Sequence, residues 1–171
     1  MAIASFAVHK ISGQSLWLTI YIKPTYTPQL SSIPLKILLA DDDIDDCIFF
    51  KTVIEELSVP FELTTVNDGE QLMKHLFQHS ETLPDIIFLD LSMPRKNGFE
   101  CLCEIKDNEV LKDIPVVMFS TSYARDPDYE ESMEKKLKDI GAFHFIKKYA
   151  ELSLLKKEIY NSIILASLIK K

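Results

Sequence analysis

The chain has 171 residues, of which 47% are hydrophobic and 26% charged, an ordinary balance for one globular domain with a sizeable core. Its net charge of −7 argues against a surface that binds nucleic-acid backbones non-specifically, and its apolar runs are too short to span a bilayer. Three cysteines without regular spacing argue against a disulfide framework and suit reduced thiols in a cytoplasmic protein.

Two parts of the chain differ in composition. Residues 1–34 end in a segment rich in Pro, Ser and Thr (23–34), and no small-residue cleavage site of a secretory signal follows their short apolar run. We therefore expect residues 1–34 to be a poorly ordered extension or linker. Residues 35–171 are expected to form one domain with an extended C-terminal helix.

From residue 35 on, short apolar runs alternate with stretches of helical periodicity. The runs that predict strands are 35–40, 61–66, 85–90, 115–120 and 142–147. Helices are predicted after each run, and Gly141 is placed to end the fourth of them. Their apolar faces are Phe50, Val53, Ile54 and Leu57; Leu72, Met73, Leu76 and Phe77; Phe99, Leu102 and Ile105; Met133, Leu137 and Ile140; and Leu152, Leu155 and Ile159. This alternation predicts an α/β fold, a doubly wound five-stranded parallel sheet with helices on both faces. Four runs are apolar enough to be buried on both sides, and the more polar run 61–66 suits an edge strand.

Polar side chains follow the predicted strands at their carboxyl ends, where open parallel sheets bind ligands. Asp41 and Asp42 follow the first run, Asp90 ends the third, Ser120 ends the fourth, and Lys148 comes soon after the fifth. Crowded carboxylates ionise together at low cost only with a cation, and Mg²⁺ is a hard ion that prefers oxygen ligands. A lysine and a hydroxyl can bind phosphate oxygens, and a carboxylate can itself be a nucleophile. The set therefore indicates phosphate and metal chemistry.

Other polar residues have simpler interpretations. Asp43, Asp45 and Asp46 lie at the predicted start of the first helix, and we expect them to be helix-start and surface acids with no catalytic role. His75 and His79 are four apart on a helix, a spacing that zinc ligands share, but without an evident third ligand an exposed polar face is the better interpretation.

Five motifs, in order, resemble the receiver domain of bacterial two-component response regulators, the chemotaxis-regulator-like family. They are ILLADDD, VNDGEQL, DIIFLDLSMPRKNGFECLCEIK, IPVVMFSTS and GAFHFIKK. The resemblance covers about residues 35–160 and implies the flavodoxin-like strand order 2-1-3-4-5.

The resemblance implies that Asp90 is the phosphoacceptor, which takes a phosphoryl group from the phosphohistidine of a histidine kinase or a histidine phosphotransfer protein. It implies Mg²⁺ as the cofactor, with Asp42 and Asp90 as direct ligands and Asp41 acting largely through metal-bound water. The backbone carbonyl of Ser92 completes the protein's share of the shell. Lys148 is expected to pair with the acceptor carboxylate and then with the phosphoryl oxygens.

The resemblance also implies a two-state switch formed by Ser120 and Phe145. Phosphorylation adds about two negative charges, Ser120 moves toward the phosphoryl group, and Phe145 fills the vacated space. The face of the fourth helix, fifth strand and fifth helix then changes its preference for an unidentified downstream protein or, as a further option, a second copy of the chain. We expect a stand-alone receiver that is not an enzyme and has no direct nucleic-acid or membrane partner.

Two features depart from the family pattern. Tyr149 stands where the family usually has proline, so we expect a trans bond before it, because a cis non-proline bond costs about 2.5–4 kcal/mol. The segment from Ser120 to Gly141 is several residues longer than the common pattern, and its extra residues, 123–131, lie where receivers meet partners. The long apolar tail 163–169 suits either a dimer surface or ordinary helix packing.

Two other functions compete with this interpretation. A Mg²⁺-dependent phosphohydrolase of the haloacid-dehalogenase type would use Asp41 as the nucleophile and Asp43 as the acid. That class needs a small turn and a hydroxyl soon after the acid pair, where this chain has Ile44 and Asp45, and it leaves Asp90 unexplained. A receiver-like protein that binds partners without phosphorylation would not need the intact set of acids.

Overall fold

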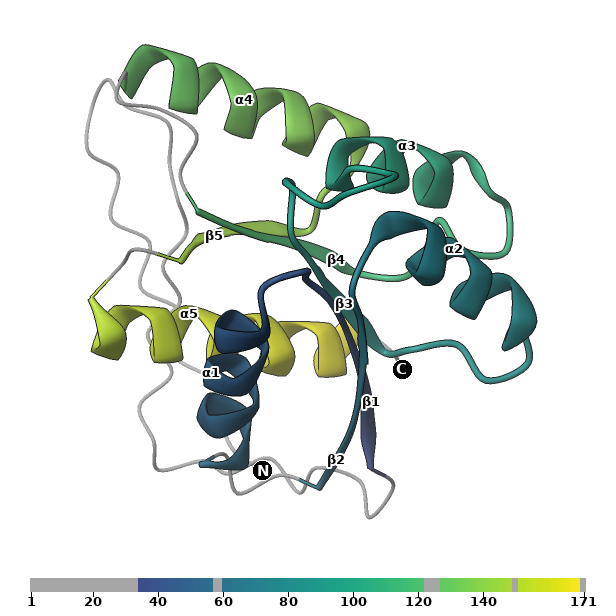
Figure 1. Cartoon of the computed structure of the whole chain (residues 1–171), viewed down its shortest axis with the longest axis horizontal. Helices are drawn as coiled ribbons and strands as arrows, with labels where there is room; N and C mark the ends of the chain where they lie inside the picture. The colour runs from purple at the N-terminus through teal and green to yellow at the C-terminus, as the bar shows by residue number, and fades with distance from the viewer. Residues whose placement is uncertain (1–33, 57–59, 122–126, 149–150, 170–171) are drawn as a thin grey trace, which may run out of the picture. The chain divides into compact units, whose positions relative to one another are not determined.

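The computed structural model describes residues 34–56, 60–121, 127–148 and 151–169, with the side chains of 127–130 left out. Within these ranges five strands alternate with five helices (Figure 1). In chain order they are β1 (Leu35–Ala40), α1 (Ile44–Glu55), β2 (Phe61–Val66), α2 (Gly69–Gln78), β3 (Ile86–Leu89), α3 (Gly98–Asp107), β4 (Val116–Ser120), α4 (Pro127–Ile140), β5 (His144–Lys147) and α5 (Leu152–Ile169). The extension expected at 1–34 lies, apart from Pro34, outside the described residues, and that domain division stays a prediction.

The strands form one parallel sheet in the order β2-β1-β3-β4-β5, which confirms the predicted fold class and strand order. β3 and β4 are buried along their whole length, as expected for apolar strands covered on both faces. β2 is an edge strand, also as predicted, and most of its residues reach solvent. The prediction for the fifth run was less accurate. β5 is the other edge strand, so only Ile146 of it is buried.

Helices cover both faces of the sheet, with α1 and α5 on one side and α2, α3 and α4 on the other (Figure 1). On the first side Phe50 of α1 packs against Phe88 and Phe119 of the central strands, with ring centroids 4.7 and 5.6 Å away. Aromatic pairs of this kind are rigid and bury a large area, so they fix the two strands from which the functional residues extend.

The predicted apolar faces are buried, or half-buried at Met133 and Ile140, with three exposed exceptions. Phe77 is 50% exposed, Phe99 38% and Leu152 53%. Each lies at the border of its helix's apolar stripe, where a side chain is covered only if a neighbouring element reaches over it. Leu57 lies outside the described residues.

Side chains and a glycine set the helix ends. Asp43 caps α1 by accepting hydrogen bonds from the backbone N–H groups of Asp45 and Asp46, as its position predicts. Gly141 has a φ of +113° and ends α4 as predicted, since only glycine adopts this conformation readily.

The C-terminal helix runs to Ile169, and Ile163 and Ala166 of its apolar tail lie in the core. Leu168 and Ile169 are exposed. Ordinary helix packing therefore accounts for part of the tail. None of the described helices combines the length and the apolar character needed to cross a membrane.

Candidate functional site

The sheet register brings the predicted site residues to one edge. Asp41 directly follows β1 and donates its backbone N–H to Val66, while Asp90 directly follows β3 and donates its own to Ala40. Lys148 follows β5, and its backbone N–H is 2.9 Å from the carbonyl of Ser120, the last residue of β4. Ladder hydrogen bonds thus continue past the strand ends and fix the backbone of the site.

The ammonium of Lys148 lies among three carboxylates. Its Nζ is 2.7 Å from Oδ2 of Asp41, 2.9 Å from Oδ2 of Asp46 and 3.0 Å from Oδ1 of Asp90. The lysine side chain is only 6% exposed and also lies 5.4 Å from the centroid of the Phe119 ring. The geometry fits the predicted pair of Lys148 with Asp90, and it adds Asp41 and Asp46 as partners.

The contact of Asp46 corrects the sequence analysis, which gave this residue no role beyond the helix start. Asp46 lies in the first turn of α1, and helical side chains point back toward the N-terminus of their helix. An acid at this position therefore reaches over the end of β1 toward Lys148. The direction of helical side chains could have indicated this contact from the sequence. The contact was missed because helix capping and the helix dipole already accounted for an acid at this position.

Burial sets the electrostatics of the cluster. Asp41 is 1% exposed, and burial raises the pKa of its carboxyl to about 6, although Lys148 and the backbone N–H of Asp43 act to lower it. Burial alone would lower the pKa of Lys148, but its hydrogen bonds with Asp41 and Asp46 and the charge of Asp90 raise it above its usual range. The lysine therefore stays charged, whereas ionisation of the buried Asp41 lowers the stability of the folded protein.

The donor chemistry of this edge fits a hard divalent cation. Asp41 and Asp90 are buried carboxylates and Asp42 is an exposed one beside them, all oxygen donors of the type that Mg²⁺ prefers. Among the described residues, no three His, Cys, Asp or Glu side chains are already grouped around a common metal position. Instead the carboxylates of Asp41 and Asp90 contact the ammonium of Lys148, so a cation at this edge would compete with it.

The two residues predicted to form the switch lie at the ends of β4 and β5. Ser120 is fully buried, and its hydroxyl donates to the carbonyl of Thr121 at 3.2 Å. Phe145 is partly buried, lies beside Met118 in the sheet register and packs against the core under α2, α3 and α4.

Tyr149 and residues 122–126 lie outside the described residues, so the predictions on the trans bond and on most of the longer segment remain predictions.

The loop after β3 is held tightly against the site. A Cβ at Gly98 would lie 2.1 Å from the backbone oxygen of Asp90, so only glycine allows α3 to start this close to the acceptor strand. Ser92 donates its backbone N–H to Oδ2 of Asp90 at 2.5 Å. Both oxygens of the Asp90 carboxylate are thus fixed, one by Lys148 and one by this loop.

Asp68 has more partners than the sequence suggested. In the motif VNDGEQL, Asp68 follows β2 at a turn, but it is also fully buried, caps α2 through the backbone N–H of Gln71, and forms an ion pair with Arg95. Arg95 belongs to the loop after β3 and has a φ of 65°, which is uncommon for a residue with a side chain. The pair ties this loop to α2, and the sequence carried no signal for it.

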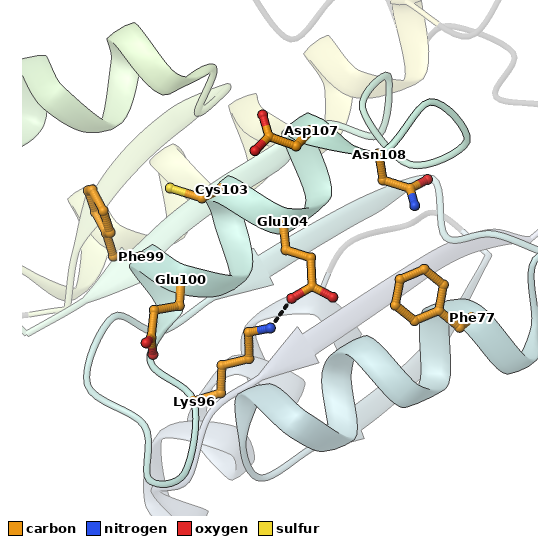
Figure 2. Close-up of a pocket in the computed structure, with 8 residues that line it drawn as sticks. All are labelled: Phe77, Lys96, Phe99, Glu100, Cys103, Glu104, Asp107 and Asn108. Atoms are coloured by element: carbon orange, nitrogen blue, oxygen red, sulfur yellow. Dashed lines mark hydrogen bonds and ion pairs between the residues drawn. The ribbon is translucent and has the colours of Figure 1, made fainter.

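A groove of about 670 Å³ lies between α2 and α3 (Figure 2). Phe77 and Phe99 stand at its opposite ends, and the ion pair of Lys96 with Glu104 lies between them. None of the predicted site residues lines this groove. It explains where the exposed Phe77 points, and it is separate from the carboxylate cluster.

Asp43 is not free to serve as the acid of a phosphohydrolase. Its Oδ1 accepts hydrogen bonds from Asp45 at 2.8 Å and Asp46 at 3.4 Å, so it is used to start α1. Asp90, which that interpretation left unexplained, lies at the centre of the cluster with Asp41 and Lys148.

Comparisons with known proteins identify relatives of this chain. Response regulator Rcp1 of Synechocystis sp. is 39% identical over 100 residues, which are 56% of this chain and 68% of that protein. The probable methanogenesis regulatory protein FilR2 of Methanothrix harundinacea is 32% identical over 96 residues, and the match spans 62% of its length. The chain thus matches about two thirds of these curated relatives.

Solved structures show the same arrangement. The crystal structure of the phosphorylated cyanobacterial phytochrome response regulator RcpA matches with a TM-score of 0.63 at 34% identity, over 75% of this chain and 91% of that one. The Mn²⁺-bound form of Rcp1 matches with a TM-score of 0.64 at 31% identity, over the same shares. The family model of the response regulator receiver domain matches residues 37–160. The chain therefore belongs to the response regulator receiver family, whose members act in two-component phosphorelay signalling.

Proposed function

We propose that Asp90 is the residue that accepts the phosphoryl group, from the phosphohistidine of a histidine kinase or a histidine phosphotransfer protein. The observation that carries this proposal is the fixed Asp90 carboxylate, with Oδ1 3.0 Å from Lys148 and Oδ2 2.5 Å from the N–H of Ser92. In the transfer, a carboxylate oxygen attacks phosphorus, the P–N bond breaks, and the imidazole leaves with its electron pair. A nucleophile held in one orientation avoids much of the entropic cost of this step.

The proposal includes Mg²⁺, held by Asp42 and Asp90, by Asp41 largely through water, and by the carbonyl of Ser92. The oxygen donors of this edge support it, and so does the Mn²⁺ bound in the related Rcp1. When bound, a divalent cation neutralises charge on the phosphoryl oxygens. Lys148 supplies the remaining positive charge, because its ammonium already lies at Asp90 and is kept protonated by its surroundings.

The output of phosphorylation is proposed to be a change of the α4-β5-α5 face. Ser120 would turn from Thr121 toward the phosphoryl group, and Phe145 would move inward from its half-buried position. A downstream protein, or a second copy of the chain, would bind the changed face, and residues 123–131 would contribute to the choice. The protein would act as a cytoplasmic receiver and not as an enzyme.

Labelling with acetyl phosphate and Mg²⁺ tests the proposed acceptor. Intact mass and a phosphate-affinity gel should show one phosphoryl group on the wild type, none on Asp90→Asn, and one on Asp45→Asn. Asp45 is a matched control because it is an exposed acid of the first turn of α1. Label that survives Asp90→Asn, or a wild type that takes no label, contradicts the proposal.

Turnover of a generic phosphate ester distinguishes the phosphohydrolase alternative. The receiver interpretation predicts no turnover beyond slow loss of the single label. Multiple turnovers that depend on Asp41 and not on Asp90 would favour the hydrolase instead.

A further inference from the structure

Asp46 is the one carboxylate partner of Lys148 that the proposed function does not use. We propose that Asp46 is a positioning residue, which holds the ammonium of Lys148 when a divalent cation binds at Asp41 and Asp90. This inference rests on the proposed function, because it concerns the same lysine and the same cation.

The contacts around the ammonium match its hydrogen-bonding capacity. A lysine has three N–H donors, and Nζ of Lys148 lies 2.7, 2.9 and 3.0 Å from one carboxylate oxygen each of Asp41, Asp46 and Asp90. The side chain of Asp46 is 31% exposed, whereas those of Asp41 and Asp90 are 1% and 4% exposed, so Asp46 is the outer member of the three.

A divalent cation changes what Lys148 can bind. A cation held by Asp90 directly and by Asp41 largely through water would repel the ammonium and compete for the oxygens that it contacts. The lysine then needs another anion or has to leave a nearly buried position for water. Asp46 offers that anion without any large movement, since it already contacts Nζ and belongs to no part of the proposed metal shell.

The position of Asp46 is fixed by its helix and not by the cluster. Asp43 caps α1 through the N–H groups of Asp45 and Asp46, so the backbone of Asp46 is anchored on the solvent side of the site. A fixed outer carboxylate therefore keeps Lys148 close to Asp90 in both states. This is where the lysine is needed when a phosphoryl group arrives.

Calorimetric titration with Mg²⁺ tests the inference. Asp46→Asn should weaken Mg²⁺ binding about tenfold, because the metal-bound state loses the partner of Lys148 while the metal-free state keeps two others. Asp45→Asn removes the same charge one residue away without a contact to Lys148 and should weaken binding by no more than about twofold. Asp46→Glu, which keeps the carboxylate, should recover most of the affinity.

A double-mutant cycle with Lys148→Met separates positioning from a direct effect on the cation. In that background Asp46→Asn should have no larger effect than Asp45→Asn, and Lys148→Gln serves for the same cycle if methionine is not tolerated. Equal effects of Asp46→Asn and Asp45→Asn in the wild-type background would overturn the inference, as would a tenfold effect that persists without Lys148. A wild type that binds no Mg²⁺ would instead contradict the proposed function itself.

Discussion

Replacing Asp41 by asparagine should make the metal-free protein more stable, although it removes a residue of the site. Burial raises the pKa of this carboxyl from 3.8 to about 6, and the favourable contacts of Lys148 and the Asp43 N–H do not offset that effect. An ionised Asp41 therefore costs the folded protein about 3 kcal/mol at pH 7. Asparagine avoids this cost and still offers an oxygen to the N–H of Asp43, which is 3.1 Å from Oδ1.

The gain from Asp41→Asn should depend on pH in a defined direction. The folded-state pKa is the higher one, so the folded protein binds the proton more tightly and the cost develops as the pH rises from 3.8 to about 6. The stabilisation by asparagine should be about 3 kcal/mol at pH 7 and about 1 kcal/mol at pH 4.5.

Urea unfolding in the presence of a chelator measures this difference at both pH values. Asp45→Asn is the control and should change the free energy of unfolding by no more than about 0.5 kcal/mol at either pH. If Asp41→Asn unfolds more easily than the wild type at pH 7, or gains the same stability at both pH values, then burial does not dominate the energetics of Asp41.

Three further predictions concern the same edge of the sheet. Lys148→Met should destabilise the metal-free protein by about 3 kcal/mol in urea unfolding, because the buried Asp41 and Asp90 lose their cation. An unchanged unfolding midpoint would show that these ion pairs make no net contribution to the free energy of unfolding. Mg²⁺ affinity measured by calorimetry should fall as the pH drops below about 6, since protons compete for Asp41, and a flat profile between pH 7 and 5 would contradict that pKa. Gly98→Ala should lower the free energy of unfolding by at least about 2 kcal/mol and slow labelling by acetyl phosphate, because the alanine Cβ would lie 2.1 Å from the backbone oxygen of Asp90. Normal stability together with normal labelling would show that the loop adapts to the added methyl group.

The sequence was sufficient to predict the strands and the sheet edge where the candidate site residues lie, because both depend on local patterns. A parallel strand that is buried on both faces must be apolar, so the first polar residue after it marks the strand's carboxyl end. Asp41, Asp90 and Ser120 were found in this way, and the parallel order of the sheet then placed them at one edge.

Contacts between elements were harder to predict. Asp46 and Asp68 each have a local explanation, the start of a helix for Asp46 and a turn for Asp68, and the structure places Asp46 in the first turn of α1 and Asp68 at the cap of α2. Their partners, Lys148 and Arg95, come from positions far along the chain, so no short pattern in the sequence links them. The exposure of Phe77 was missed for a related reason, because helical periodicity does not tell whether a neighbouring helix covers the border of the stripe.

The cost of ionising Asp41 also suggests how the site couples to the rest of the fold. About 3 kcal/mol is a large part of the 5–15 kcal/mol by which domains are usually stable, so a rigid support is needed to hold the charges together. Phe88 and Phe119 lie on the strands that carry Asp90 and Ser120, and the ring of Phe50 from α1 packs against both, which provides such support. A cation that binds at Asp41 and offsets the cost of its burial would therefore stabilise the folded protein. The backbone of Lys148 is hydrogen-bonded to Ser120 at the ends of β4 and β5, so we expect a movement of Lys148 to act on the two strand ends where the proposed switch lies.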